Sequence, residues 1–294
     1  MDRKIPFLKY RPLALTLSAI LFAVFLAGTV KNSGFTLGVD FAGGSKLTVA
    51  FEKGVDESSI RSTLSVYNPI VQRIGSGERN EFIISTSLQD EGEDSPGIVY
   101  ELREILSAEY ENVEFLSVEN VGPAIGAYLT KSALKLILIA VILMSLYLAF
   151  RFEVKYAVGA VAALLHDLGL VILFIGFAGV EINIPVVAAL LTVFGYSVND
   201  TIVIFDRIRE NVNLESKTTL PDLVNMSINQ SIVRTLITSL TTLIAVVSLY
   251  ILGGEGINEF ALVLIVGIAV GTYSSIYIAS PVLLWWEKVK LYKR

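Results

Sequence analysis

The sequence predicts an all-α bundle of six transmembrane helices with one ferredoxin-like α+β domain placed after the first helix. Three observations lead to this prediction. Of the 294 residues, 53% are hydrophobic and only 17% are charged, a balance typical of polytopic membrane proteins. Six apolar stretches have the roughly 17–25 residues needed to cross a bilayer. The one long hydrophilic stretch, residues 32–125, carries 16 acidic and 6 basic residues, whereas the rest of the chain carries 12 and 17.

The first unit, residues 1–31, is predicted to be an N-terminal tail and a signal-anchor helix. The first 12 positions carry four basic residues, and residues 13–30 are apolar, as in a signal peptide. The apolar stretch is longer than a usual signal-peptide core, however, and no A-x-A cleavage site follows it. We therefore expect an uncleaved first span with a cytoplasmic N-terminus.

The second unit, residues 32–125, is predicted to be a globular domain with the order βαββαβ, which is the ferredoxin-like pattern. Its first strand ends in the alternation Leu47, Val49, Phe51. Asp56 is a plausible N-cap for a short helix. The remaining elements are expected to be two strands that form a hairpin, near 70–74 and 81–86, a helix from Ser95-Pro96 to about Tyr110, and a last strand at 113–118.

The third unit, residues 126–294, is predicted to hold the other five spans, at about 134–150, 156–178, 186–205, 231–252 and 260–284. A polar segment at about 207–230 is expected to be a cytoplasmic loop with a short surface helix after Pro221. Gly267 and Gly271 form a GxxxG pattern in the sixth span, which indicates close helix packing.

The distribution of Lys and Arg predicts the orientation. They cluster near the N-terminus, at 151–155, at 207–217 and at the C-terminus, whereas the loops at 179–185 and 253–259 have none. By the positive-inside rule, both termini are cytoplasmic and the acidic domain lies on the outer side. We expect a multi-pass protein of the cell inner membrane with a periplasmic domain.

Several function classes are disfavoured by what the sequence lacks. It has no Cys and one His, so thiolate or His-rich metal sites are not expected. No GxxxxGK[ST] loop is present, which argues against nucleotide hydrolysis. There is also no HExxH, and no Ser/His/Asp set at plausible depth for a hydrolase. We expect no cofactor, no metal, no enzymatic activity and no nucleic-acid partner.

The strongest candidate for function is Asp200, which lies within an apolar run that begins near Pro185. A carboxylate in hydrocarbon costs roughly 2.5–3.5 kcal/mol on insertion scales and usually marks an ion or proton path. Helical spacing places it on one polar face with Thr192, Tyr196 and Asn199. The alternative is a structural carboxylate paired with a neighbouring helix, and we favour the functional interpretation.

Arg234 is the expected partner of Asp200, because antiparallel fourth and fifth spans would place the two residues at comparable depth. The fifth span also carries a polar stripe of Ser and Thr residues that includes Thr238. The alternative is that Arg234 reaches back to the lipid headgroups, which its position permits. The sequence leaves these two interpretations open.

Other ionisable residues are weaker candidates. Asp167 is a possible proton relay or a structural partner, and His166 is more simply a core residue. Because adjacent residues on a helix point about 100° apart, the two need not touch. Asp206 lies near the membrane interface beside other charges and is expected to be a solvated helix end.

Three segments closely resemble the SecF family of bacterial protein translocase subunits, within the SecD/SecF family and the RND superfamily. They are GVDFAGG at 38–44, GYSVNDTIVIFDRIREN at 195–211 and RTLITSLTTL at 234–243. The resemblance covers the whole chain. It implies a half-transporter that pairs with SecD and acts with SecYEG, SecA and YajC on unfolded secretory polypeptides, driven by the proton motive force. In the family, the residues that match Asp200 and Arg234 belong to the proton path.

Two alternatives remain beside protein export. A small-molecule efflux half-transporter would share the intramembrane carboxylate, but the single small acidic domain disfavours it. A scaffold that stabilises a channel without using protons would need Asp200 and Arg234 only for assembly.

Overall fold

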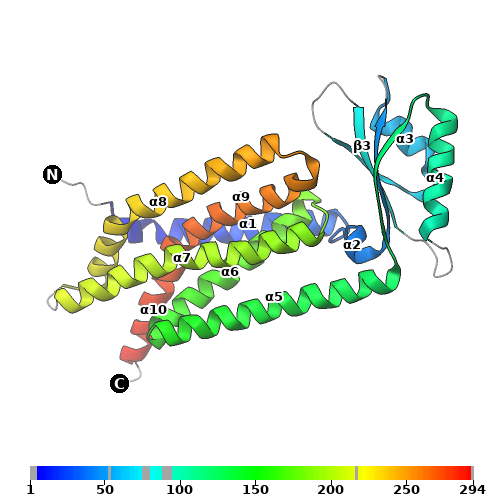
Figure 1. Ribbon diagram of the computed structural model, residues 1–294. Helices are drawn as coiled ribbons and strands as arrows, with labels where there is room; N and C mark the ends of the chain where they lie inside the picture. Colours follow the sequence, from blue (N-terminus) through cyan, green and yellow to red (C-terminus); the bar gives the residue numbers. More distant parts are fainter. Residues whose placement is uncertain (1–4, 52–53, 75–79, 88–94, 216–217, 293–294) are drawn as a thin grey trace.

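The computed structural model consists of a bundle of long helices and a small α+β domain at one end of it (Figure 1). It describes residues 5–51, 54–74, 80–87, 95–215 and 218–292. Both ends of the described chain lie away from the domain, at the opposite end of the bundle. We therefore refer to the domain end and the termini end of the bundle.

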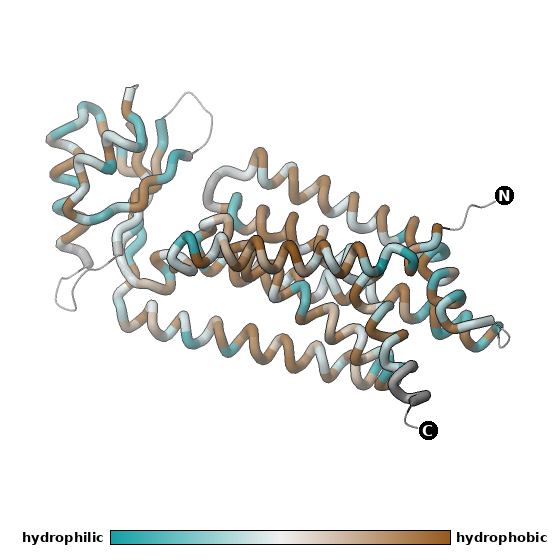
Figure 2. The backbone as a smooth tube through the Cα atoms, turned by 180° about the vertical axis from the view of Figure 1, so that it is seen from behind, coloured by the Kyte–Doolittle hydropathy of each residue, from teal (hydrophilic) through white to brown (hydrophobic). Residues whose placement is uncertain are grey.

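Six helical stretches of the described chain are long and apolar enough to cross a membrane, at 7–31, 123–151, 154–178, 184–214, 220–252 and 257–287. Each contains one predicted span, so the six-span prediction is confirmed. Hydrophobic residues dominate these helices, and hydrophilic ones gather in the domain and at the helix ends (Figure 2). The helices are α1 (Arg11–Lys31), preceded by a 3₁₀ turn η1 (Phe7–Tyr10), α5 (Pro123–Arg151), α6 (Val154–Ala178), α7 (Ile184–Leu214), α8 (Leu220–Leu252), α9 (Glu255–Ser274) and α10 (Ser280–Tyr292), with a π-helical turn η3 (Ser275–Ala279) between the last two.

Helix α7 lies at the centre of the bundle and contacts α5, α6, α8 and α9. The predicted close packing of the sixth span is confirmed. A Cβ atom on Gly267 would lie 2.1 Å from Cγ2 of Val193, and one on Gly271 would lie 3.0 Å from Cα of Ser197. Only the absence of a side chain lets α9 approach α7 this closely. Helix α5, in contrast, is mostly exposed along its apolar length.

The prediction of a separate surface helix after Pro221 is wrong. Residues 207–214 continue α7, and α8 runs without a break from Leu220 to Leu252. Pro221 is accommodated because it lies in the first turn, where a missing N–H is tolerated. Polar residues in the first turns of α8 pack on the N-terminal segment. Asn229 donates to the carbonyl of Ile5 at 2.8 Å and accepts from its N–H at 2.8 Å, and Asn225 donates to the same carbonyl at 3.1 Å.

The domain has the ferredoxin-like topology that the sequence predicts. Its four-stranded antiparallel sheet has the order β2-β3-β1-β4. Asp56 caps α3 by accepting from the N–H of Ser59 at 2.8 Å, which confirms the predicted cap. The elements are α2 (Val39–Ala42), β1 (Gly44–Phe51), α3 (Glu57–Thr63), η2 (Ser65–Tyr67), β2 (Ile70–Ile74), β3 (Asn80–Ser87), α4 (Ser95–Glu109) and β4 (Glu114–Val121).

The core of the domain lies between the sheet and the two helices α3 and α4, on the side of the sheet facing away from the bundle (Figure 1). Leu47, Val49 and Phe51 all point into this core, as their alternation predicts. Ile60 of α3 and Leu102 of α4 are fully buried against them. This core contains residues of the domain alone.

A compact junction joins the domain to the bundle. The linker before α2 pairs with the loop between α6 and α7, because Gly38 N–H donates to the Ile182 carbonyl and Ile182 N–H donates to the Thr36 carbonyl, both at 2.8 Å. Gly43 has a φ of 76° and forms the turn into β1, as expected of a turn glycine. A Cβ atom on Gly126 of α5 would lie 2.9 Å from the Phe41 carbonyl oxygen. The start of α5 thus rests on the turn.

Glu181 makes this junction sensitive to pH. Burial raises the pKa of its carboxyl group, and the neighbouring Glu259 raises it further, against the opposing charge of Lys46. The folded chain therefore keeps the Glu181 proton to a higher pH than the unfolded chain does. The stability that this proton provides is lost as the pH rises through the raised pKa.

We expect Glu181→Gln to raise the thermal stability of the full-length chain at pH 8 by a few degrees, because the uncharged amide avoids both burial of charge and repulsion. The gain should shrink towards pH 4, where the wild-type carboxyl group is protonated. Melting temperatures in detergent across this pH range measure it. Glu104→Gln, at an exposed site on α4, is the matched control. A gain that is constant with pH would contradict the assignment.

Candidate functional site

Asp200 lies in the middle of α7 and is 2% exposed. Its Oδ2 accepts hydrogen bonds from Ser239 of α8 at 3.2 Å and from Thr272 of α9 at 3.4 Å. The two hydroxyl oxygens also lie 2.7 Å from each other, and because each hydroxyl group has one hydrogen, two of these three contacts can be hydrogen bonds at a time. The carboxylate is therefore held by neutral hydroxyl groups from two neighbouring helices.

Helical periodicity explains why these residues meet. On α7, Ser197, Asp200 and Ile204 are buried at i, i+3 and i+7, on the side facing α8 and α9. On α8, buried residues recur every four positions at Ser231, Thr235 and Ser239, so this polar face turns toward the bundle.

No cation balances the charge of Asp200 among the residues that the structure describes. Its side chain makes no ion pair there, and its hydroxyl partners carry no charge. A carboxylate at this depth needs a proton, water or a cation from elsewhere. The arrangement is thus suited to bind and release a proton.

The structure does not bring Arg234 to Asp200. Arg234 is exposed, and no hydrogen bond or ion pair joins these two described side chains. Ser239, which does reach Asp200, is five residues further along α8, and five residues turn a helix by about 140° beyond a full turn. The prediction from depth ignored which face of α8 each residue occupies, and Arg234 lies on the outer one.

Asn199 and Thr238 also lie apart from the carboxylate. Asn199 is exposed, so the predicted polar stripe of α7 splits into a buried part with Asp200 and an outer part with Thr192 and Asn199. The Thr238 hydroxyl group donates to carbonyls of its own helix, and its carbonyl accepts from the Tyr196 hydroxyl group at 3.0 Å. Tyr196 also bonds to Thr242, so it ties α7 to α8.

Asp167 is the centre of a second polar cluster and is 1% exposed. Its Oδ2 accepts from Ser197 at 2.5 Å and from Ser274 at 2.6 Å, and its Oδ1 lies 2.8 Å from Nδ1 of His166. The adjacent His166 and Asp167 side chains thus do touch. This cluster joins α6, α7 and α9, one turn of α7 away from Asp200.

The hydrogen-bond donors of this cluster indicate that one proton lies between His166 and Asp167. The Tyr273 hydroxyl group donates to the Ala14 carbonyl at 2.5 Å, so the Ser18 hydroxyl group must donate its hydrogen to Tyr273, 3.0 Å away. Ser18 can then only accept from Nε2 of His166, also at 3.0 Å. With Nε2 protonated, one further proton lies between Nδ1 and Asp167. His166 and Asp167 together therefore hold a shared proton, either as an ion pair or as two neutral groups.

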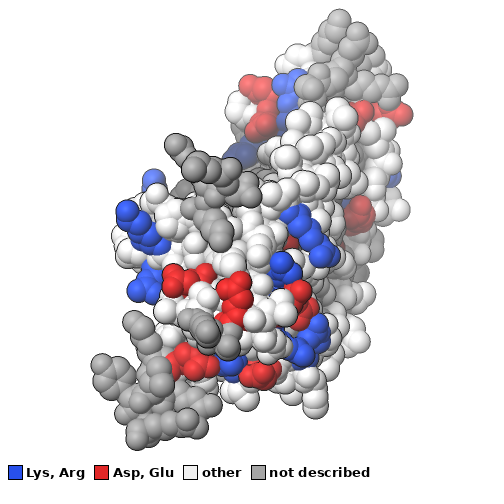
Figure 3. Space-filling model, turned by 90° about the vertical axis from the view of Figure 1, so that its left-hand side faces the viewer, with Lys and Arg blue, Asp and Glu red and all other residues white. Residues whose placement is uncertain are grey.

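Asp206 lies at the termini end and forms an ion pair with Arg151, whose Nη2 lies 2.6 and 2.9 Å from the two carboxylate oxygens. Arg207 and Glu210 pair nearby at 2.5 Å. Positive and negative side chains are interspersed on this end of the molecule (Figure 3). These contacts agree with a solvated helix end rather than a proton site.

Sequence reasoning missed two residues that hold the Asp200 carboxylate, Ser239 and Thr272, and a third, Asp40, that binds the start of its helix. Ser239 follows Thr238 directly, but the polar stripe predicted for this span did not include it, because the helix face was not assigned. Thr272 could have been found from its helical spacing to Ile268 and Ser275, which places it on the side of α9 that faces α7. Asp40 was seen only as part of a motif. Its Oδ2 accepts from the N–H of Ile184 at 2.9 Å, at the start of the helix that carries Asp200.

The fold and the site define a six-span membrane protein with a buried, uncompensated carboxylate in its central helix. The family described as protein export membrane protein SecD/SecF, C-terminal, matches residues 101–289, and the SecD/SecF GG motif matches residues 32–55. The chain belongs to the SecD/SecF family, as its sequence motifs indicate.

Relatives of known class agree with this assignment. The protein translocase subunit SecF of Desulfurispirillum indicum is 40% identical over 290 residues, which cover 96% of this chain and 92% of the relative. The subunit SecDF of Thermus thermophilus is 38% identical over 280 residues, but these cover only 37% of that longer chain. The crystal structure of SecDF from the same organism, described as a translocon-associated membrane protein, matches with a TM-score of 0.85 at 35% identity, over 98% of this chain and 39% of that one.

Proposed function

We propose that this chain is a protein-export subunit that works with SecD and uses the proton motive force to assist secreted polypeptides through SecYEG, after SecA has threaded them. The observation that carries this proposal is Asp200, a buried carboxylate whose partners among the described residues are hydroxyl groups. In this proposal Asp200 is the proton acceptor. The cluster of Asp167 and His166 holds a second proton one helical turn away. YajC is a further expected component of the complex.

The surface of α7 supports a partner chain beside this site. Thr192, Gly195 and Asn199 form an exposed stripe of small and polar residues on the helix that is otherwise the most central one. Arg234 lies on the exposed face of neighbouring α8. Small and polar residues in hydrocarbon usually contact another helix. A six-span SecD bundle would cover this stripe and could bring Arg234 into the proton path through rearrangement at the interface.

The junction supplies a route from the proton site to the domain. Asp40 binds the first turn of α7, and the same linker pairs with the loop before that helix. In this proposal the termini are cytoplasmic and the domain is periplasmic, where it contacts the emerging polypeptide. A potential of 100 mV provides roughly 2.3 kcal/mol per proton, enough to bias a small rearrangement of the domain.

The test is export of a secreted protein into membrane vesicles after SecA-driven threading, with and without a proton gradient, in membranes that lack or contain this chain. We expect stimulation that requires both the chain and the gradient, and co-purification of a homologous six-span protein with a larger outer domain. Export that is unaffected by the chain, combined with gradient-dependent efflux of small molecules, would favour the efflux alternative. Stimulation without a gradient would favour a scaffold.

A further inference from the structure

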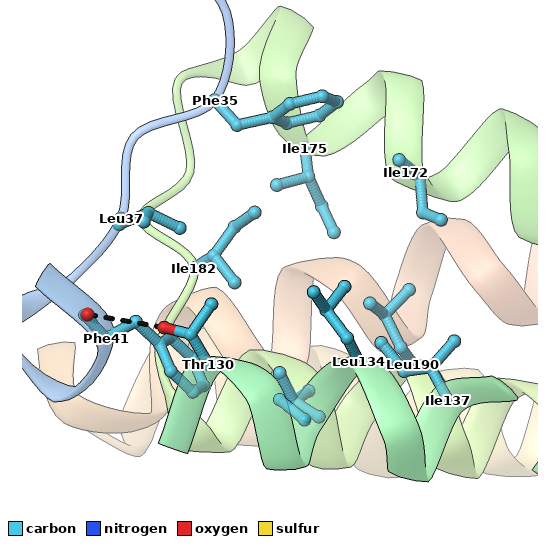
Figure 4. Close-up of a pocket in the computed structure, with 12 residues that line it drawn as sticks. Phe35, Leu37, Phe41, Thr130, Leu134, Ile137, Ile172, Ile175, Ile182 and Leu190 are labelled. Carbon is cyan, nitrogen blue, oxygen red and sulfur yellow. Dashed lines mark hydrogen bonds between the residues drawn. The ribbon is translucent and has the colours of Figure 1, made fainter. Parts of the chain in front are cut away.

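A cavity of about 190 Å³ lies between α5, α6 and α7 near the domain end of the bundle (Figure 4). Ile175 of α6 and Leu190 of α7 form its buried floor. Leu134 and Ile137 of α5 form one wall, and Phe35 and Leu37 of the linker close the end nearest the domain. It is distinct from the site around Asp200, with which it shares no lining residue.

The cavity offers no free polar group to a ligand. Its one polar side chain is Thr130, whose hydroxyl group is already bonded to the carbonyl oxygens of Gly126 at 3.0 Å and Phe41 at 3.3 Å. Apolar cavities of about 150 Å³ in proteins stay dry and take up apolar molecules. A polypeptide segment would leave its backbone groups unsatisfied there, and a helix, about 10 Å wide, would not fit.

The mouth of the cavity opens at the outer surface of the bundle. Leu134 is 66% exposed, and Phe35 and Leu37 are each 44% exposed. Few contacts hold α5 against the rest of the bundle on this side, so the space between the helices is accessible from the surrounding hydrocarbon.

Two lysines mark the depth of this mouth. About 20 helical residues cross the hydrocarbon. If the span of α5 is taken to end at Phe150, the opposite edge of the hydrocarbon lies near Lys131. Lys135 lies one turn deeper, and side chains on a helix tilt toward its N-terminus, so Lys135 can reach back to the headgroup level. Both are exposed, on the face of α5 that adjoins Thr130 and Leu134. Neither makes a hydrogen bond or ion pair within the described chain.

We propose that this cavity binds one acyl chain of an anionic phospholipid from the leaflet on the domain side, with its phosphate held by Lys131 and Lys135. Depth, the apolar lining and the charge at the mouth all match this one ligand. The bound chain fills the space between α5 and the bundle, directly below the junction. It thereby supports α5, the helix whose start packs against the turn at Gly43.

Native mass spectrometry of the full-length, delipidated chain in mild detergent tests the proposal, with dioleoyl phosphatidylglycerol and dioleoyl phosphatidylcholine as probes. We expect one phosphatidylglycerol per chain, retained at least tenfold better than phosphatidylcholine. Ala133→Trp, which fills the cavity, should reduce retention at least tenfold. Leu143→Trp, at an exposed position of the same helix about 180° around from Leu134, is the matched control and should retain the lipid.

A second variant leaves the packing intact. The double substitution Lys131→Gln and Lys135→Gln should remove the preference for phosphatidylglycerol without altering retention of phosphatidylcholine. Equal retention of the two lipids by the wild-type chain would overturn the proposal. So would phosphatidylglycerol binding that survives either Ala133→Trp or the loss of both lysines.

Discussion

Asp200→Asn is expected to abolish the proton-gradient-dependent part of protein export and to leave the gradient-independent part unchanged. The amide has nearly the same shape as the carboxyl group and can still accept from Ser239 and Thr272, so α7, α8 and α9 stay packed. It cannot, however, gain or lose a proton. Export by inverted membrane vesicles, with the gradient present and then collapsed, measures the loss directly.

Asp206→Asn is the matched control, because it makes the same change on the same helix. Asp206 pairs with Arg151 at the exposed termini end, and its loss should leave gradient-dependent export intact. The amount of assembled complex must be measured beside export. Full gradient-dependent stimulation in Asp200→Asn would show that Asp200 is not the proton site, and a loss that follows complex yield alone would point to a scaffold.

Asp167→Leu is expected to destabilise the bundle by several kcal/mol, about 1–3 kcal/mol for each buried hydrogen-bonding group that it leaves unpaired. The change would strand the donors of Ser197 and Ser274 and leave Nδ1 of His166 without its partner. Little folded chain should accumulate in membranes, and the purified remainder should melt at a lower temperature. Both the yield and the melting temperature report this effect.

Asp167→Asn separates a structural role from a role in proton transfer. An amide oxygen can still accept from the two serines, so the folded chain should be recovered at near wild-type yield. If the shared proton of His166 and Asp167 takes part in transport, gradient-dependent export will fall although the yield is preserved. Normal accumulation of Asp167→Leu would mean that the cluster contributes little to the fold.

The sequence was sufficient to predict the order and class of the elements. Apolar length located all six spans, and the alternation of Leu47, Val49 and Phe51 identified the strand on which the domain is built. These signals are local and strong. The ends of α8 were harder to locate, because Asn225 and Asn229 look like surface residues until their partner Ile5, more than 200 residues away, is known.

Prediction of the site was limited in the same way, because contacts between distant helices are not encoded in local patterns. Asp200 was found because a carboxylate in an apolar run is conspicuous by itself. Its neighbours Ser239 and Thr272 depend on the rotation of two other helices about their axes, which the prediction did not assign although the spacing around Thr272 offered a signal. The pairing of Arg234 with Asp200 was considered from depth alone, without the helix face, and about 140° around α8 separates Arg234 from Ser239, which does reach Asp200.

The junction also determines the order in which the domain and the bundle assemble during synthesis. The domain core is complete once residue 121 has been synthesised, whereas its docking partner, the loop with Ile182, emerges some 60 residues later, after two further spans. Domains generally fold as units during synthesis, N-terminal ones first. The domain must therefore acquire its structure before this pairing exists, and the pairing forms only when α6 and the loop after it have been made. Completion of the junction is thus a late step of biogenesis, and a ribosome stalled before Ile182 would display a folded domain that contacts the start of α5 but lacks its pairing with the loop before α7.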